Sequence, residues 1–283
     1  MRAKIRDTEL YFDIEGAGLV PDGDRMREKP VAFLVHGGPG ADHSSFKPTL
    51  SALSAKMQLV YFDHRGQGRS ARAPKQTYTL ENNVEDMNAL RQYLGLDQIV
   101  VIGASYGGMV ALTYASRYPE TVSHLIVMVT AANFGFLERA RANLQTRGTA
   151  AQQAIAQYLW DGTFRDDDHL REYFQVMGPL YALTFDPDAA KTSGQRAILS
   201  ADAINQAFGG FLRTYDIRRQ LPRITAPTLV IGARHDWICP PEFSQEIAQL
   251  IPHADLRIFE HSGHSIRVDQ PEALLDAISD FIV

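Results

Sequence analysis

The pentapeptide Gly-Ala-Ser-Tyr-Gly at 103–107 has the residue types and spacing to place a reactive hydroxyl on a sharp turn. It follows four consecutive β-branched residues at 99–102, a run typical of a fully buried strand. A helical pattern then extends from Met109 to Tyr118. In a Gly-x-Ser-x-Gly turn the small residues allow close chain approach, and the serine oxygen projects over a helix N-terminus. We therefore predict that Ser105 is a nucleophile; the alternative is an ordinary serine in a glycine-rich turn.

A serine nucleophile needs a base, and Asp236 and His264 follow it in chain order. Each lies just beyond a predicted strand, one beginning at Thr228 and one covering 255–259. The carboxyl ends of parallel strands share one edge of a sheet, where catalytic groups collect. Imidazole titrates near neutral pH, and a carboxylate fixes its tautomer. We predict that Ser105 attacks a carbonyl carbon, His264 transfers the proton and Asp236 orients His264.

A glycine-rich loop at 36–40, His-Gly-Gly-Pro-Gly, follows a predicted buried strand at 31–35. Such a loop exposes backbone N–H groups that have no local acceptor. We predict that the N–H groups of Gly37 and Tyr106 form an oxyanion hole. The alternative is a glycine turn that serves only a crossover connection. His36, at the start of the loop, is expected to support it rather than take part in catalysis.

Other residues compete weakly for the same roles. His261 is better explained as a turn residue, and His235 is free to point away from the site. The strand predicted at 124–130 ends in Thr130 rather than an acid, which favours Asp236 as the carboxylate. No group of His, Cys or Asp has the spacing of metal ligands, so no metal is expected.

The elements that must position these residues alternate between strand and helix. Strands predicted at 31–35, 59–63, 99–102, 124–130, within 228–236 and at 255–259, with helices at 80–95, 109–118, 241–251 and 271–282, indicate an α/β fold with a mostly parallel sheet covered on both faces. An antiparallel edge pair is expected within 3–14, and a surface loop at 16–29. The alternation stops at 132–221, where helices are predicted at 136–147, 150–158, 169–177 and 206–221. We expect this segment to be a helical cap inserted into a core formed by 1–131 and 222–283.

Composition excludes several classes of protein. The 283-residue chain has a net charge of −5 and no basic patch, so nucleic acid is not an expected partner. Cys239 is the single cysteine, which excludes intrachain disulfides and favours a reducing compartment. No apolar run approaches the ~18 residues that span a bilayer, and the N-terminus has no apolar signal region. A soluble cytoplasmic protein is expected; the sequence leaves its oligomeric state open.

The motifs together resemble the α/β-hydrolase superfamily over nearly the whole chain. The segments at 36–40, 63–70 and 103–108 resemble its proline iminopeptidase branch, which includes the tricorn-interacting aminopeptidases. This resemblance implies a pocket under a cap and no cofactor. It also implies hydrolysis of a small molecule or short peptide through an acyl-enzyme.

The chain departs from that branch where the resemblance implies acids that hold the substrate's ammonium. Asp236 is followed by Trp237, and residues 201–206 offer only Asp202. An ammonium buried without a carboxylate is strongly disfavoured. Candidate substrate contacts are Trp237, Asp202 and Gly38. Two hydrolase functions therefore stay open, a proline iminopeptidase-like aminopeptidase or amidase and a carboxylesterase or lactonase for neutral apolar substrates; a non-catalytic ligand receptor is a remote third.

Overall fold

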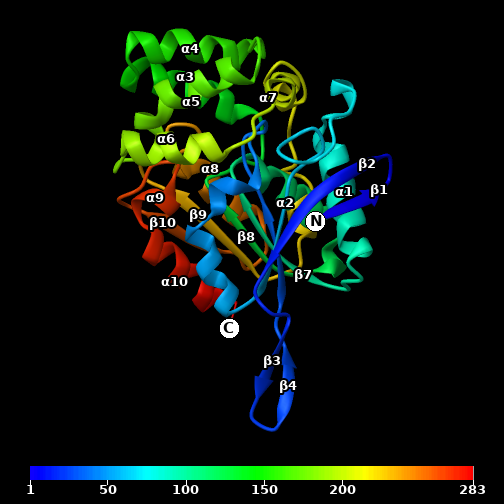
Figure 1. Ribbon diagram of the computed structural model, residues 1–283. Coiled ribbons are helices and arrows are strands. Elements are labelled where there is room, and N and C mark those ends of the chain that lie inside the picture. Colours follow the sequence, from blue (N-terminus) through cyan, green and yellow to red (C-terminus); the bar gives the residue numbers. More distant parts are fainter. Residues whose placement is uncertain (283) are drawn as a thin grey trace.

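A computed structural model describes residues 1–282 and contains a central eight-stranded sheet (Figure 1). Its strands are β1 (Arg2–Ile5), β2 (Thr8–Glu15), β5 (Val31–Val35), β6 (Gln58–Phe62), β7 (Ile99–Ala104), β8 (Val122–Met128), β9 (Thr228–Ala233) and β10 (Asp255–Phe259). Their order in the sheet is β1-β2-β6-β5-β7-β8-β9-β10. The β1–β2 and β2–β6 pairs are antiparallel and all other pairs are parallel. The predicted mostly parallel sheet is confirmed.

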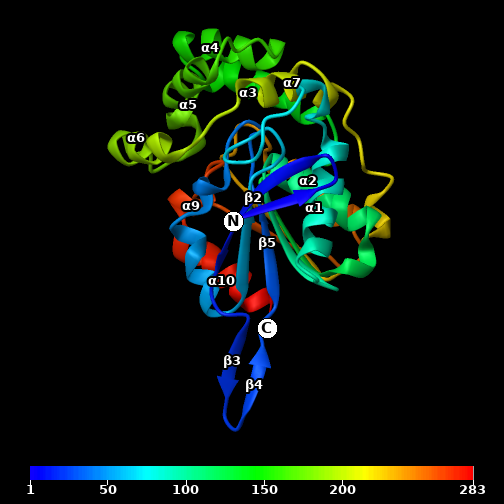
Figure 2. The same cartoon turned by 45° about the vertical axis from the view of Figure 1, so that its right-hand side comes forward.

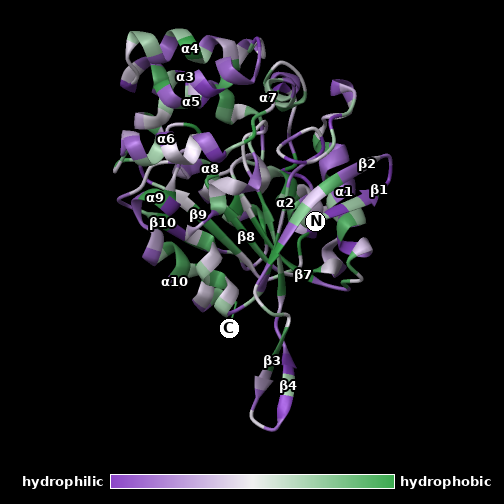
Figure 3. Cartoon of the chain, in the orientation of Figure 1, coloured by the Kyte–Doolittle hydropathy of each residue, from purple (hydrophilic) through white to green (hydrophobic). Residues whose placement is uncertain are grey.

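Helices cover both faces of the sheet because consecutive strand residues point to opposite sides. Phe33 and Val101 belong to an apolar cluster that includes residues of α1 (Leu80–Tyr93), α2 (Tyr106–Arg117) and α8 (Pro241–Leu250). Leu34 and Val100 belong to a second cluster with α10 (Pro271–Phe281) and the 3₁₀ helix Thr49–Ala55. Figure 3 shows the hydrophobic colour concentrated on the central strands. The sheet is thus the middle layer of three, which fixes the strand ends that carry the candidate site.

Five helices lie between β8 and β9 in the chain: α3 (Gly135–Arg147), α4 (Ala150–Asp161), α5 (Asp167–Tyr181), α6 (Pro187–Arg196) and α7 (Ala201–Phe208). In Figures 1 and 2 they lie together beyond one end of the sheet. The two ends of this insertion are joined by hydrogen bonds from Phe134 N to Tyr215 O (2.7 Å) and from Ile217 N to Ala132 O (2.9 Å). We propose that the insertion acts as a cap; the predicted boundaries at 132 and 221 stay a prediction.

Two sequence-based assignments were wrong. Residues 16–29 form a projecting hairpin, β3 (Leu19–Asp22) and β4 (Arg25–Glu28), rather than a loop (Figure 2). Every residue of β4 is exposed, so the hairpin has no buried face to leave an alternating apolar pattern. The helix predicted at 206–221 is also absent. Helix α7 ends at Phe208, where two glycines follow, and only short 3₁₀ turns at Phe211–Arg213 and Leu221–Arg223 remain.

Candidate active site

Ser105 lies on the turn between β7 and α2 with a strained backbone (φ 55°, ψ −124°). A Cβ atom on Gly107 would lie 1.9 Å from the Val35 carbonyl oxygen, and one on Gly103 would lie 2.4 Å from the Gly107 oxygen. The turn is held by hydrogen bonds from Ser105 N to Met128 O (2.9 Å) and from Thr130 Oγ1 to Ser105 O (2.7 Å). The surrounding chain therefore enforces the strained turn, and only glycine fits at its two flanking positions.

Gly107→Ala is expected to destabilise the protein by more than about 3 kcal/mol, because the new methyl group meets a backbone carbonyl that cannot move alone. Gly194→Ala is the matched control, since no atom of residues 1–282 lies within 4 Å of the added Cβ and the site is helical. It should stabilise by about 0.5–1 kcal/mol. Urea denaturation measures the free energy of unfolding of both variants. Equal small changes in the two would contradict the crowding at position 107.

Asp236 and His264 form a buried pair at the carboxyl ends of β9 and β10. His264 Nδ1 lies 2.8 Å from Asp236 Oδ2. The other carboxylate oxygen, Oδ1, accepts hydrogen bonds from Ile238 N (2.8 Å) and Cys239 N (3.0 Å). Both carboxylate oxygens of Asp236 thus accept hydrogen bonds. Because a carboxylate can only accept, Nδ1 of His264 must carry the proton. This leaves Nε2 as the basic nitrogen.

The turn that carries His264 is bound to the end of α5. The Tyr181 ring packs edge-on against the His264 ring, with centroids 5.5 Å apart. Ser265 N donates to Tyr181 O (2.8 Å). Asp269 accepts from Gly263 N on one oxygen and from Thr184 on the other, at 2.8 Å in each case. The inserted helices therefore help to fix the orientation of His264.

Ser105 and His264 line the same cavity, which has a volume of about 970 Å³. Its wall is largely apolar and aromatic and is drawn from both the sheet end and the insertion; members include Met109, Phe136, Trp160, Phe174, Tyr181 and Leu212. The volume lies within the range common for small-molecule sites. Cys239 also lines the cavity, and burial raises the pKa of its thiol well above the usual value. It is therefore a protonated wall residue rather than a second nucleophile.

Gly37 lies against the nucleophile: a Cβ atom there would be 3.1 Å from Ser105 Cβ and 3.7 Å from Ser105 Oγ. Within residues 1–282 neither Gly37 N nor Tyr106 N has a protein acceptor. Gly37, Gly38 and Tyr106 all line the cavity. The geometry is compatible with the oxyanion hole we predicted, which remains a prediction.

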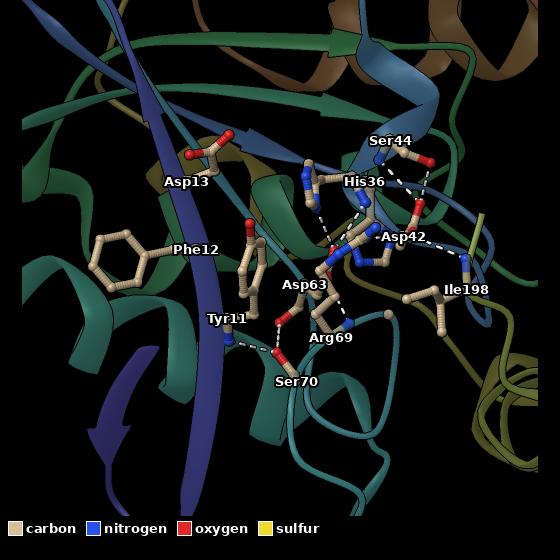
Figure 4. Close-up of polar contacts among 12 residues, drawn as sticks. Tyr11, Phe12, Asp13, His36, Asp42, Ser44, Asp63, Arg69, Ser70 and Ile198 are labelled. Atoms are coloured by element: carbon tan, nitrogen blue, oxygen red, sulfur yellow. Dashed lines mark hydrogen bonds and ion pairs between the residues drawn. The ribbon is translucent and has the colours of Figure 1, made fainter. Parts of the chain in front are cut away.

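A buried polar network supports the glycine loop from behind (Figure 4). The Asp63 carboxylate accepts from His43 N (2.9 Å), His43 Nδ1 (2.7 Å) and Arg69 N (2.8 Å). The Asp42 carboxylate accepts from Arg69 Nη1 (3.2 Å) and from Ile198 N (2.9 Å), which lies in the insertion. Gly40 N of the loop donates to Gln67 Oε1 (2.7 Å), so the segment at 63–70 links the loop to the insertion. This positioning role could not be assigned from the sequence.

His36 and His64 are buried in the same region. His64 N donates to His36 Nε2 (3.2 Å), which places the proton of His36 on Nδ1, 2.9 Å from Gly37 O. Burial lowers the pKa of His36 and lowers that of His64 further. Both rings are therefore neutral at pH 7, and His36 supports the loop as expected.

Stability is expected to fall as the pH drops below about 6.5, the unfolded-state pKa of histidine. In that range the unfolded chain binds protons that native His36 and His64 do not, so unfolding becomes more favourable. Each group contributes at most about 1.4 kcal/mol per pH unit. Urea titrations between pH 7.5 and 5.5 measure the slope. His64→Gln retains a donor toward His36 O and should flatten it; an unchanged slope would refute the assignment.

The sequence of this chain is similar to those of known proteins with the same architecture. The sequence pattern of the alpha/beta hydrolase fold family matches residues 30–271. The chain belongs to the alpha/beta hydrolase fold family. A protein named proline iminopeptidase PfmaB from Pestalotiopsis fici is 34% identical over 274 residues, covering 95% of this chain and 97% of that protein. The proline iminopeptidase of Levilactobacillus brevis is 31% identical, with coverages of 89% and 87%. The predicted resemblance is confirmed.

Solved structures of the alpha/beta hydrolase fold are similar over the whole chain. An esterase from Exiguobacterium antarcticum has a TM-score of 0.79 at 22% identity, covering 99% of this chain and 98% of that one. A proline iminopeptidase from Mycobacterium smegmatis has a TM-score of 0.78 at 22% identity, with coverages of 100% and 97%. At such identities the likeness concerns the fold alone, and it does not separate esterase from peptidase activity.

Two of the candidate substrate contacts lie outside the pocket of this alpha/beta hydrolase. Trp237 is fully buried, but it packs behind Tyr181 and Trp160 and does not line the cavity. Asp202 is exposed on α7 and does not line the cavity either. The structure thus gives no support to an ammonium contact at Asp202 or to direct substrate contact by Trp237. Gly38 does lie in the cavity wall.

The cavity wall also contains charged residues that sequence reasoning missed, above all Arg267 of the short helix α9 (Ile266–Asp269). The one feature of the sequence that could have suggested Arg267 is its position three residues after His264. Among residues 1–282, no cluster of three or more His, Cys, Asp or Glu could hold a metal ion. In the same residues, no helix has the length and apolarity to cross a membrane.

Proposed function

We propose that this chain is a serine hydrolase that cleaves small carboxylic esters, lactones included, through an acyl-enzyme. The observation that carries the preference for esters is the charge of the cavity wall. Among the described residues that line it, the only carboxylate is Asp186, which is exposed and caps α6 through Asp188 N and Ala189 N. A substrate ammonium placed deep in this apolar pocket would have no anionic partner, which is strongly unfavourable.

The proposed reaction uses only side chains and backbone groups of the chain. Ser105 Oγ attacks the ester carbonyl while His264 Nε2 takes its proton, and the imidazolium is stabilised by Asp236. The oxyanion accepts hydrogen bonds from Gly37 N and Tyr106 N. Collapse of the tetrahedral intermediate breaks the ester C–O bond, and His264 returns the proton to the leaving alcohol. Water, activated by the same histidine, then hydrolyses the acyl-enzyme and restores Ser105.

A paired substrate measurement tests the preference. We would compare kcat/KM for an aryl ester of a short acid with kcat/KM for the aryl amide of proline, with a free and with an acetylated amine. We expect efficient cleavage of the ester. Acetylation of the amine should not lower kcat/KM for the amide. Efficient cleavage of the free amide, abolished by acetylation, would contradict the ester proposal.

An aminopeptidase acting on N-terminal proline is the second candidate. It is favoured by relatives at 34% and 31% identity that carry the name proline iminopeptidase. This candidate requires a carboxylate that holds the substrate amine. Asp186 is the one acid in the cavity wall among residues 1–282, so Asp186→Asn should then abolish amide cleavage and spare the ester.

A further inference from the structure

Arg267 is exceptional among the arginines of this protein. Five arginines within residues 1–282 are buried or half-buried: Arg65, Arg69, Arg91, Arg171 and Arg267. The first four donate hydrogen bonds to carboxylates, carbonyls or side-chain amides. In the same part of the chain Arg267 has neither a hydrogen bond nor an ion pair, although it lines the cavity that contains Ser105.

An arginine in this position has unused binding capacity. Its guanidinium carries five N–H donors and stays charged at neutral pH. Burial lowers the pKa of Arg267, and no neighbouring carboxylate offsets that effect. Partial burial of a charge without a partner is unfavourable. An anionic ligand that entered the cavity would relieve this cost.

The other charges of the cavity favour the same ligand. Lys47 is occupied by Asp13 and Glu15, at 2.7 Å each, and Arg171 donates to Ala197 O at 3.3 Å. Lys191 and Arg196 of α6 are exposed where they line the cavity. Because two carboxylates neutralise Lys47, the charges that remain in the described wall besides Arg267 are the cations Arg171, Lys191 and Arg196 and the exposed carboxylate of Asp186. This excess of positive charge attracts anions.

We propose that Arg267 binds a carboxylate of the substrate, so that the preferred substrate is a small ester that also bears a free carboxylate. This inference rests on the proposed ester hydrolysis. The planar guanidinium fork matches a carboxylate in two parallel hydrogen bonds. Arg267 follows His264 by three residues, so their Cα atoms are at most about 11 Å apart. This limit favours a short chain between the carboxylate and the scissile ester. Phe174 and Tyr181 are among the apolar residues that line the same cavity.

The test uses three methyl esters of equal length that differ only at the far end. They are monomethyl adipate, its terminal primary amide and methyl 6-aminohexanoate, which end in an anion, a neutral group and a cation. Monomethyl succinate and glutarate vary the spacing. We would measure kcat and KM by acid release for the wild type, Arg267→Met and Arg257→Met. Arg257 is exposed on β10 and does not line the cavity, so it is the matched control.

We expect the wild type to prefer the best anionic ester over its amide by about 10-fold or more in kcat/KM, the range of a hydrogen-bonded ion pair. Arg267→Met should remove that preference through KM, with a loss on the amide ester at least about five-fold smaller than the loss on the anionic ester. Arg257→Met should change neither. The free diacid should inhibit the wild type competitively and inhibit Arg267→Met at least about 10-fold more weakly.

The outcomes separate the two proposals. If Ser105-dependent cleavage of the amide ester is present but the anionic ester has no advantage, the carboxylate inference fails and ester hydrolysis stands. If Arg267→Met lowers cleavage of all three esters equally, Arg267 has only a structural role and the inference also fails. If none of the esters is cleaved by wild type, the proposed function itself fails. Binding of the diacid to Ser105→Ala, lost in the double variant with Arg267→Met, would still support the anion site.

Discussion

Ser105→Ala is expected to lower kcat/KM for ester hydrolysis by about 10⁴-fold or more, because no other group can form the acyl-enzyme. The variant should fold normally, since the Ser105 backbone N and O, rather than its hydroxyl, hold the turn in place. Initial-rate assays and labelling by a fluorophosphonate measure the effect. Ester hydrolysis and fluorophosphonate labelling should both disappear in this variant.

Ser193→Ala is the matched control for this experiment. Ser193 lines the same cavity from α6, and within residues 1–282 its hydroxyl makes no hydrogen bond. Its removal should leave rate and labelling within about two-fold, as for most surface changes away from the chemistry. Persistent labelling in Ser105→Ala would show that another residue is the nucleophile. Absence of labelling in wild type would favour a non-catalytic ligand receptor.

Asp236→Asn is expected to reduce kcat by about 10⁴-fold with little loss of stability. The Asn carbonyl would keep the two hydrogen bonds from Ile238 N and Cys239 N, which orients its NH₂ toward His264 Nδ1. That donor forces the His264 proton onto Nε2, the nitrogen that must accept the serine proton. The opposite orientation of the Asn side chain is unfavourable, because it would place the NH₂ group against the N–H donors of Ile238 and Cys239.

Steady-state kinetics and thermal unfolding measure the two parts of that expectation. Asp202→Asn is the control, because Asp202 is an exposed carboxylate that does not line the cavity. It should change neither kcat nor KM on esters or on free-amine substrates. A selective loss on free-amine substrates in Asp202→Asn would restore the ammonium contact considered from the sequence. A mild effect of Asp236→Asn would mean that Asp236 does not set the tautomer.

The elements of the sheet were predictable because burial on both faces leaves a direct pattern in the sequence. Strand β7 begins with four consecutive β-branched residues, and the glycines of its turn are required because an added Cβ would lie only 1.9–2.4 Å from backbone oxygens. The order of Ser105, Asp236 and His264 along the chain follows from that regularity, since each lies after a parallel strand. Exposed elements such as β4 and α6 bury no face, so they leave no such pattern.

The fold, the family and the order of the residues proposed for catalysis could therefore be inferred from the sequence. The surroundings of those residues could be learned only from the folded chain. Only the placement of α7 and of the loop after β9 showed that Asp202 and Trp237 do not line the cavity. Arg267 stood out only because it has no partner among residues 1–282. Periodicity reports whether a residue is buried, because burial acts on each element separately. Which side chains meet in a pocket depends on contacts between elements far apart in the chain, and no local pattern records them.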